Sequence, residues 1–197
     1  MVVAQLPIAD WIAPGNSFPA LLRGELIFWA LAALIVCYVL FVERRPLSSI
    51  GLRRPTWKTL IFGVAAGFIM IGGGLLLYVY VLPALRLQPN AAGLATVQKL
   101  PLWFQFTILI RAPVFEEIFY RGFAIERLSA ILGNRWIAAI ISLVAFTYAH
   151  LSYWGWPVLI VVGFQGSLLT ALFLWRRDLG ANMIAHFMTD AIAFFAF

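Results

Sequence analysis

Charged residues are scarce in this chain, at 11% of its 197 residues, whereas hydrophobic residues make up 63%. The mean hydropathy is +0.95, and several apolar runs approach or exceed about eighteen residues, the length that favours a membrane-spanning helix. This composition excludes a soluble globular domain and predicts a polytopic membrane protein.

Other features are absent as well. Cys37 is the single cysteine, which excludes an intramolecular disulfide. The first residues lack the basic region and small-residue cleavage site of a signal peptide, so we expect the first span to target the chain. We expect residues 1–19 to be a short N-terminal segment on the membrane surface, and residues 20–197 to be a single transmembrane domain.

The apolar runs and the breaks between them predict an all-α fold, a polytopic transmembrane helical bundle of about six spans plus short surface helices. The breaks lie at basic, proline-rich residues 43–58, at residues 82–93, which are rich in Pro, Asn and Gly, and at charged residues 176–182. The expected helices are residues 20–42, 57–82, 101–129, 136–151, 155–175 and 180–197.

The net charge of +6 does not indicate nucleic-acid binding, because the basic residues gather in short connections between apolar runs and act as topology determinants. We expect no nucleic-acid partner and a lipid environment. Basic connections favour the cytoplasmic side, which predicts an integral membrane protein with its N-terminus outside and its site opening toward the cytoplasm. The small size and the lack of a eukaryotic targeting signal favour a bacterial plasma membrane. The three connections that agree contain Arg44, Arg45, Arg53, Arg54 and Lys58; Arg121, Arg127 and Arg135; and Arg176 and Arg177.

Two adjacent carboxylates, Glu116 and Glu117, lie inside an apolar segment, where charged groups are costly and usually face a protein interior or a water-filled cavity. Arg121 is four residues after Glu117, a spacing that suits an ion pair within one helix. Glu116 points about 100° away around the helix and has no basic residue three or four positions on.

Both histidines of the chain, His150 and His186, also occupy apolar segments. Asp190 lies one helical turn after His186, close enough to accept its ring N–H. A hairpin turning near Leu132 would bring Glu116 and His150 to the same level. His186 would join them if the hairpin tip projects about 10 to 15 Å beyond the connection at residues 176–178. The simpler interpretation of these polar groups is a network that holds helices together.

These residues form three motifs in order. "APVFEEIFYRG" contains Glu116, Glu117 and Arg121; "FTYAH" contains Phe146 and His150; "HFMTD" contains His186 and Asp190. Together they resemble the CPBP intramembrane protease family, which includes CAAX prenyl endopeptidases and bacteriocin-processing or immunity proteins. The resemblance covers about residues 45–197. Relatives often carry Asn at the position of Asp190.

The resemblance implies hydrolysis of a peptide bond in a membrane-associated or prenylated substrate, without a cofactor. It implies that Glu116 acts as general base on a water held with His150, that His186 stabilises the oxyanion with Asp190 beside it, and that Arg121 positions Glu117. Two histidines and a glutamate would also suit zinc, although no zinc-binding signature is present. A non-catalytic immunity or partner-stabilising factor and a proton-coupled carrier are the alternatives from other classes.

Overall fold

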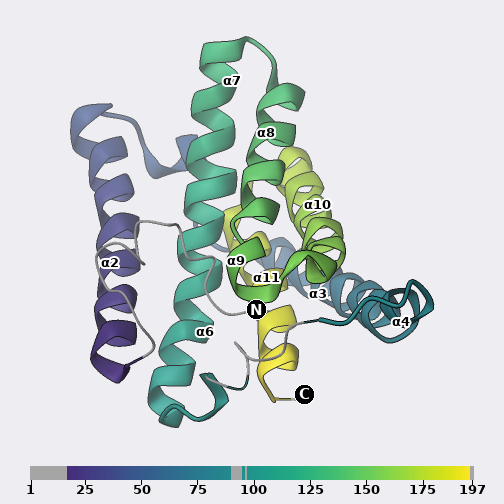
Figure 1. Ribbon diagram of the computed structural model, residues 1–197. Helices are drawn as coiled ribbons and strands as arrows, with labels where there is room; N and C mark the ends of the chain where they lie inside the picture. The colour runs from purple at the N-terminus through teal and green to yellow at the C-terminus, as the bar shows by residue number, and fades with distance from the viewer. Residues whose placement is uncertain (1–16, 90–94, 96, 196–197) are drawn as a thin grey trace.

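The computed structural model describes residues 17–89, 95 and 97–195, which form a bundle of helices (Figure 1). The predicted all-helical class is confirmed, since the described residues contain no strand. Each of the six expected helices corresponds to one helical segment. In chain order these are α2 (Phe18–Cys37) with the π-helix η1 (Tyr38–Val42); α3 (Trp57–Leu76) with the π-helix η3 (Leu77–Val81) and α4 (Leu82–Ala84); α6 (Leu102–Glu116) with the π-helix η4 (Glu117–Ile125) and α7 (Glu126–Leu132); α8 (Arg135–Tyr148); α10 (Leu159–Arg176); and α11 (Leu179–Phe195).

Short elements occupy two of the connections. The 3-10 helix η2 (Leu47–Ile50) joins α2 to α3, while α9 (Leu151–Trp154) and the 3-10 helix η5 (Trp156–Val158) join α8 to α10. The expected helix 136–151 therefore ends earlier, at Tyr148, and His150 lies in the turn that leads into α9. Residues 1–16 of the expected surface segment lie outside the described residues.

Three helical segments are long and apolar enough to cross a membrane: Phe18–Val42, Trp57–Ala84 and Trp156–Arg176. The apolar helices Arg135–Tyr148 and Leu179–Phe195 are shorter, and the α6–η4–α7 segment carries several charged residues. The distribution of polarity is that of a membrane protein. Large apolar side chains such as Leu34, Phe41 and Ile69 are at least 60% exposed, whereas the charged side chains at the centre of the bundle are buried.

Helix α11 lies inside the bundle and packs against α3, α6 and α10. Its contact with α3 depends on Gly63 and Gly67, which are four residues apart. A Cβ atom at Gly63 would lie 2.8 Å from the Cβ of Ile184, and one at Gly67 would lie 2.7 Å from the sulfur of Met188. Small residues at this spacing allow the close helix approach that stabilises membrane bundles, and here they seat the helix that carries His186 and Asp190.

The three basic connections lie at one end of the bundle and are joined by polar contacts. Arg127 pairs with Glu43, Arg177 donates to Glu126 over 2.6 Å, and Arg135 donates to the carbonyl of Leu174 over 2.9 Å. The turn between α7 and α8 lies beyond the end of α10 (Figure 1). This is the projection of the hairpin tip that was needed to bring His186 to the level of Glu116 and His150. Gly133, with φ of +64°, closes this turn.

Candidate active site

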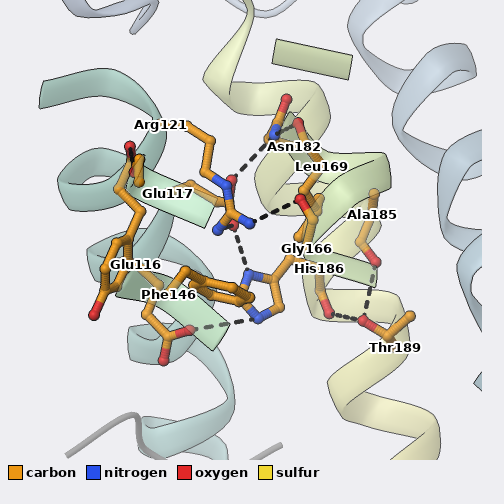
Figure 2. Close-up of polar contacts among 12 residues, drawn as sticks. Glu116, Glu117, Arg121, Phe146, Gly166, Leu169, Asn182, Ala185, His186 and Thr189 are labelled. Carbon is orange, nitrogen blue, oxygen red and sulfur yellow. Dashed lines mark hydrogen bonds and ion pairs between the residues drawn. The ribbon is translucent and has the colours of Figure 1, made fainter. Parts of the chain in front are cut away.

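Six polar side chains from three parts of the bundle converge in its interior. Glu116 ends α6, Glu117 and Arg121 belong to η4, His150 precedes α9, and His186 and Asp190 lie on α11. Each of these residues is at most 1% exposed. The structure therefore brings together all six predicted site residues. Figure 2 shows Glu116, Glu117, Arg121 and His186 of this group.

Glu116 faces both histidines. Its Oε2 atom lies 3.9 Å from Nε2 of His150 and 3.9 Å from Nε2 of His186. These distances are too long for direct hydrogen bonds. None of the described residues hydrogen bonds to either carboxylate oxygen of Glu116 or to the two Nε2 atoms, although all four atoms are buried. Buried polar atoms are normally satisfied, so this group is suited to binding a small polar molecule.

A π-helix begins directly after Glu116. The ring of Pro113 cannot donate a hydrogen bond to the carbonyl of Leu109, and the backbone from Glu117 to Ile125 then winds as η4. Single π-helical turns interrupt α-helices frequently at functional sites. Sequence reasoning did not predict this change of winding, because so short a segment gives no periodicity signal.

Glu117 binds three side chains. Its Oε1 atom accepts a hydrogen bond from Nη1 of Arg121 at 2.9 Å and from Nδ1 of His186 at 2.8 Å, and its Oε2 atom accepts one from Nδ2 of Asn182 at 3.1 Å. The predicted pairing of Glu117 with Arg121 is confirmed. Since the carboxylate accepts from Nδ1, the His186 ring presents Nε2 toward Glu116 (Figure 2).

Phe146 links Arg121 to His150. The guanidinium carbon of Arg121 lies 4.0 Å from the centre of the Phe146 ring, and the backbone carbonyl of Phe146 accepts a hydrogen bond from Nδ1 of His150 at 2.7 Å. This bond leaves Nε2 of the neutral His150 ring as a hydrogen-bond acceptor directed at Glu116. The four-residue spacing of the Phe-x-x-x-His motif thus has a physical basis, because a helical turn places the carbonyl beside the ring.

Arg121 is held on a second side by the carbonyl of Gly166 in α10, which accepts from Nη2 at 3.2 Å. A Cβ atom at Gly166 would lie 3.0 Å from two carbons of the Phe146 ring. The glycine therefore lets α10 approach closely enough for its carbonyl to reach the guanidinium.

The expectation that Asp190 accepts the ring N–H of His186 is wrong. Asp190 Oδ2 lies 3.6 Å from Nε2, beyond hydrogen-bond distance, and Glu117 binds the Nδ1 N–H instead. The reason is that η4 packs against α11 and delivers a carboxylate to the opposite side of the ring. Neither oxygen of Asp190 has a hydrogen-bond partner among the described residues, so it belongs to the same unsatisfied group as Glu116.

The arrangement of the donor side chains bears on metal binding. In the part of the chain that the structure describes, no group of three or more His, Cys, Asp or Glu side chains is arranged as a metal site. The distance of 3.9 Å from Glu116 Oε2 to Nε2 of each histidine accommodates a bridging water.

Two comparisons with known proteins found similarity to this chain. Residues 98–192 match the family described as type II CAAX prenyl endopeptidase Rce1-like. The predicted family resemblance is confirmed. The Rce1-like match includes all six predicted site residues. The chain is also 26% identical, over 189 residues, to the "UPF0177 protein in abiGi 5'region" of Lactococcus lactis subsp. cremoris, an alignment that covers 94% of this chain and 72% of the relative. No solved structure matches the chain significantly.

Within the Rce1-like segment, sequence reasoning missed Asn182. Its Nδ2 group donates to Glu117 and, at 2.7 Å, to the carbonyl of Leu169 in α10. The signal was present, because Asn182, His186 and Asp190 follow one another at four-residue intervals and so share one face of α11.

Sequence reasoning also missed a second buried ion pair beside the site. Nε and Nη2 of Arg111 donate to the carboxylate of Glu25, with a shortest distance of 2.8 Å, and the Phe28 ring centre lies 4.6 Å from the guanidinium carbon. Arg111 is fully buried and Glu25 is 4% exposed. The pair joins α2 to α6, the helix that ends in Glu116.

Proposed function

We propose that this protein is an intramembrane endopeptidase that hydrolyses a peptide bond of a membrane-associated or lipidated substrate with water activated by Glu116 and His150. The Rce1-like match supports the reaction class. The observation that carries the proposal is the position of the Glu116 carboxylate, 3.9 Å from Nε2 of both histidines, with none of these atoms hydrogen bonded within the described residues.

The first step is activation of water. A water placed between Glu116 and His150 donates one hydrogen to the carboxylate and the other to Nε2 of His150, which is an acceptor because its Nδ1 N–H is bound to the Phe146 carbonyl. Both lone pairs of the water oxygen then face the substrate. As the oxygen attacks the peptide carbonyl carbon, one of its protons moves to Glu116.

The second step is stabilisation of the tetrahedral oxyanion. His186 directs Nε2 into the same space, and in its imidazolium form it donates from Nδ1 to Glu117 and from Nε2 to the oxyanion. The negative charges of Glu117 and of the nearby Asp190 favour that form. Collapse of the intermediate breaks the carbon–nitrogen bond, and the proton held by Glu116 passes to the leaving amine.

Glu117, Arg121 and Asn182 act through His186. Glu117 orients the ring, Arg121 compensates the buried carboxylate charge, and Asn182 holds the second carboxylate oxygen. Such preorganisation matters in a dry interior, where a displaced ring cannot be replaced by bulk water. The positions of the basic connections support a topology with the N-terminus outside and the basic end in the cytoplasm, the side from which we expect substrate to enter.

The test uses the purified full chain in detergent with a mixture of farnesylated and unmodified peptides and hydrophobic membrane peptides, analysed by mass spectrometry. We expect site-specific cleavage by the wild type and its loss in Glu116→Gln, His150→Ala and His186→Ala. The matched control is Glu126→Gln, on the same helical segment but in the partly exposed pair with Arg177. Cleavage retained by all three site variants would refute the assignment. Inactive wild type with folded variants would favour a non-catalytic membrane factor.

A further inference from the structure

A group of exposed basic side chains surrounds the connection between α2 and α3 and the first turn of α3. We call it the basic patch, and it consists of Arg44, Arg45, Arg53, Arg54 and Lys58. Arg44 adopts a positive φ of +54°, a conformation that is uncommon for a residue other than glycine. The backbone here thus keeps a strained turn that presents two adjacent arginines at the surface.

The acidic side chains near the patch are already engaged. Glu43 pairs with Arg127, Glu126 pairs with Arg177, and Asp178 accepts hydrogen bonds from Thr59 at 2.8 Å and from the backbone of Ala181 at 3.4 Å. Among the described residues, no salt bridge joins the basic patch to an acidic side chain. Five positive charges therefore remain available to an external anion.

Apolar side chains border the patch. Phe41, Val42 and Trp57 are between 66% and 72% exposed, and the Lys58 ammonium lies 5.5 Å from the Trp57 ring centre. Trp136 and Trp175, at the same end of the bundle, are also about two-thirds exposed. Exposed tryptophans at helix ends are typical of the membrane–water interface. A partner that presents negative charge beside hydrocarbon fits this surface better than a soluble polyanion does.

We propose that the basic patch binds the phosphate headgroups of anionic phospholipids in the leaflet that surrounds this end of the bundle. Clusters of four to eight basic residues beside a membrane span attract such lipids, and the attraction weakens with salt. If these charges served only to set the topology of the chain, the folded protein would show no preference for anionic lipids over neutral ones.

The patch is mechanically connected to the candidate active site. Ile50, between its two arginine pairs, is fully buried, and the carbonyl of Gly51 accepts a hydrogen bond from the backbone of Leu179 at 2.9 Å. A Cβ atom at Gly122, the residue after Arg121, would lie only 2.7 Å from the carbonyl oxygen of Ile50. Lipid binding would thus restrain a connection that packs directly on η4. Any effect on cleavage rests on the proposed function, whereas binding does not.

The experiment measures quenching of tryptophan fluorescence by brominated phosphatidylglycerol and by brominated phosphatidylcholine, added to the full chain in neutral-detergent micelles. We expect phosphatidylglycerol to bind at least about tenfold more tightly at low salt, and this preference to fall at high salt. Arg53→Gln/Arg54→Gln and Arg44→Gln/Arg45→Gln should each reduce the preference about tenfold. The matched control, Arg86→Gln/Lys99→Gln, removes two exposed charges outside the patch and should retain it.

Equal binding of both lipids by the wild type would overturn the proposal, as would an unchanged preference in both patch variants. Soluble glycerol phosphate should not compete at matched concentration, because it lacks the hydrocarbon that the apolar border requires; full competition would also contradict a lipid site. The thermal midpoint of each variant in detergent confirms folding, and these outcomes are independent of peptidase activity.

Discussion

His186 is oriented by Glu117, whose Oε1 atom accepts the Nδ1 N–H of the ring at 2.8 Å across the contact between α11 and η4. The same oxygen accepts from Arg121 at 2.9 Å. The second glutamate of the motif is therefore the centre of a network, while the first, Glu116, is unsatisfied. Adjacent carboxylates in one segment thus have different hydrogen-bond surroundings.

Glu117→Gln should reduce cleavage about ten- to a hundredfold, since losing a charge-assisted hydrogen bond costs roughly 1.5 to 3 kcal/mol and that loss is felt when His186 meets the oxyanion. Most of the reduction should appear in kcat, because the carboxylate contacts His186 rather than substrate. Single-turnover rates at saturating peptide would measure it. Activity equal to that of the wild type would show that the network does not orient a working histidine.

Asp190→Asn should retain more activity than Asp190→Ala. Asn keeps a polar group 3.6 Å from Nε2 of His186 and adds an N–H donor that can face the oxyanion, whereas Ala removes both polar atoms. Single-turnover rates of the three forms on one cleaved peptide provide the comparison. Equal losses in the two variants would indicate that the negative charge of Asp190 is what matters, either to hold His186 as an imidazolium or to bind a cation.

Chelator treatment should leave cleavage largely unchanged, and metal analysis of the purified protein should give well under one zinc per chain. The reason is that the described site offers a carboxylate and two imidazole nitrogens spaced for a bridging water rather than closed around an ion. Activity would be measured before and after dialysis against a strong chelator. Stoichiometric zinc, whose removal abolishes cleavage and whose return restores it, would replace the metal-free mechanism with a zinc-dependent one.

Arg111→Met should destabilise the protein strongly, by about 3 to 5 kcal/mol if the cost resembles that of breaking a buried pair in a soluble protein, because Glu25 is left buried and unpaired. The double variant Glu25→Leu/Arg111→Met should recover much of that loss, since it removes both charges. Thermal unfolding of each variant in one detergent would measure the difference. If the double variant is no more stable than the single one, Arg111 has a role beyond pairing with Glu25.

Contacts within one helix were accessible to prediction because their geometry follows from a fixed number of residues per turn. The pairing of Glu117 with Arg121 is of this kind. The approach of Glu116 to His150 joins two helices, but its level also follows from counting residues on either side of a hairpin near Leu132. His186 and Asp190 are also four residues apart, yet the expected hydrogen bond between them is not formed. A competing acceptor from another helix reached the ring, and spacing along one helix contains no information about such a competitor.

The sequence alone determined that this is a helical membrane protein, approximately where its helices run, and which polar residues are candidates for its chemistry. The length of the apolar runs is enough to predict the helices, because a backbone in a bilayer must satisfy its own hydrogen bonds. Because burying charge in a membrane is costly, the few charged residues inside apolar segments are candidates for function. Only the tertiary structure decided which carboxylate orients His186, that Asn182 supports it, and that Arg111 pairs with Glu25. Those contacts depend on how each helix is rotated and how closely it approaches its neighbours. Glycines at the helix contacts set the approach, and the π-helical turn after Glu116 sets the rotation.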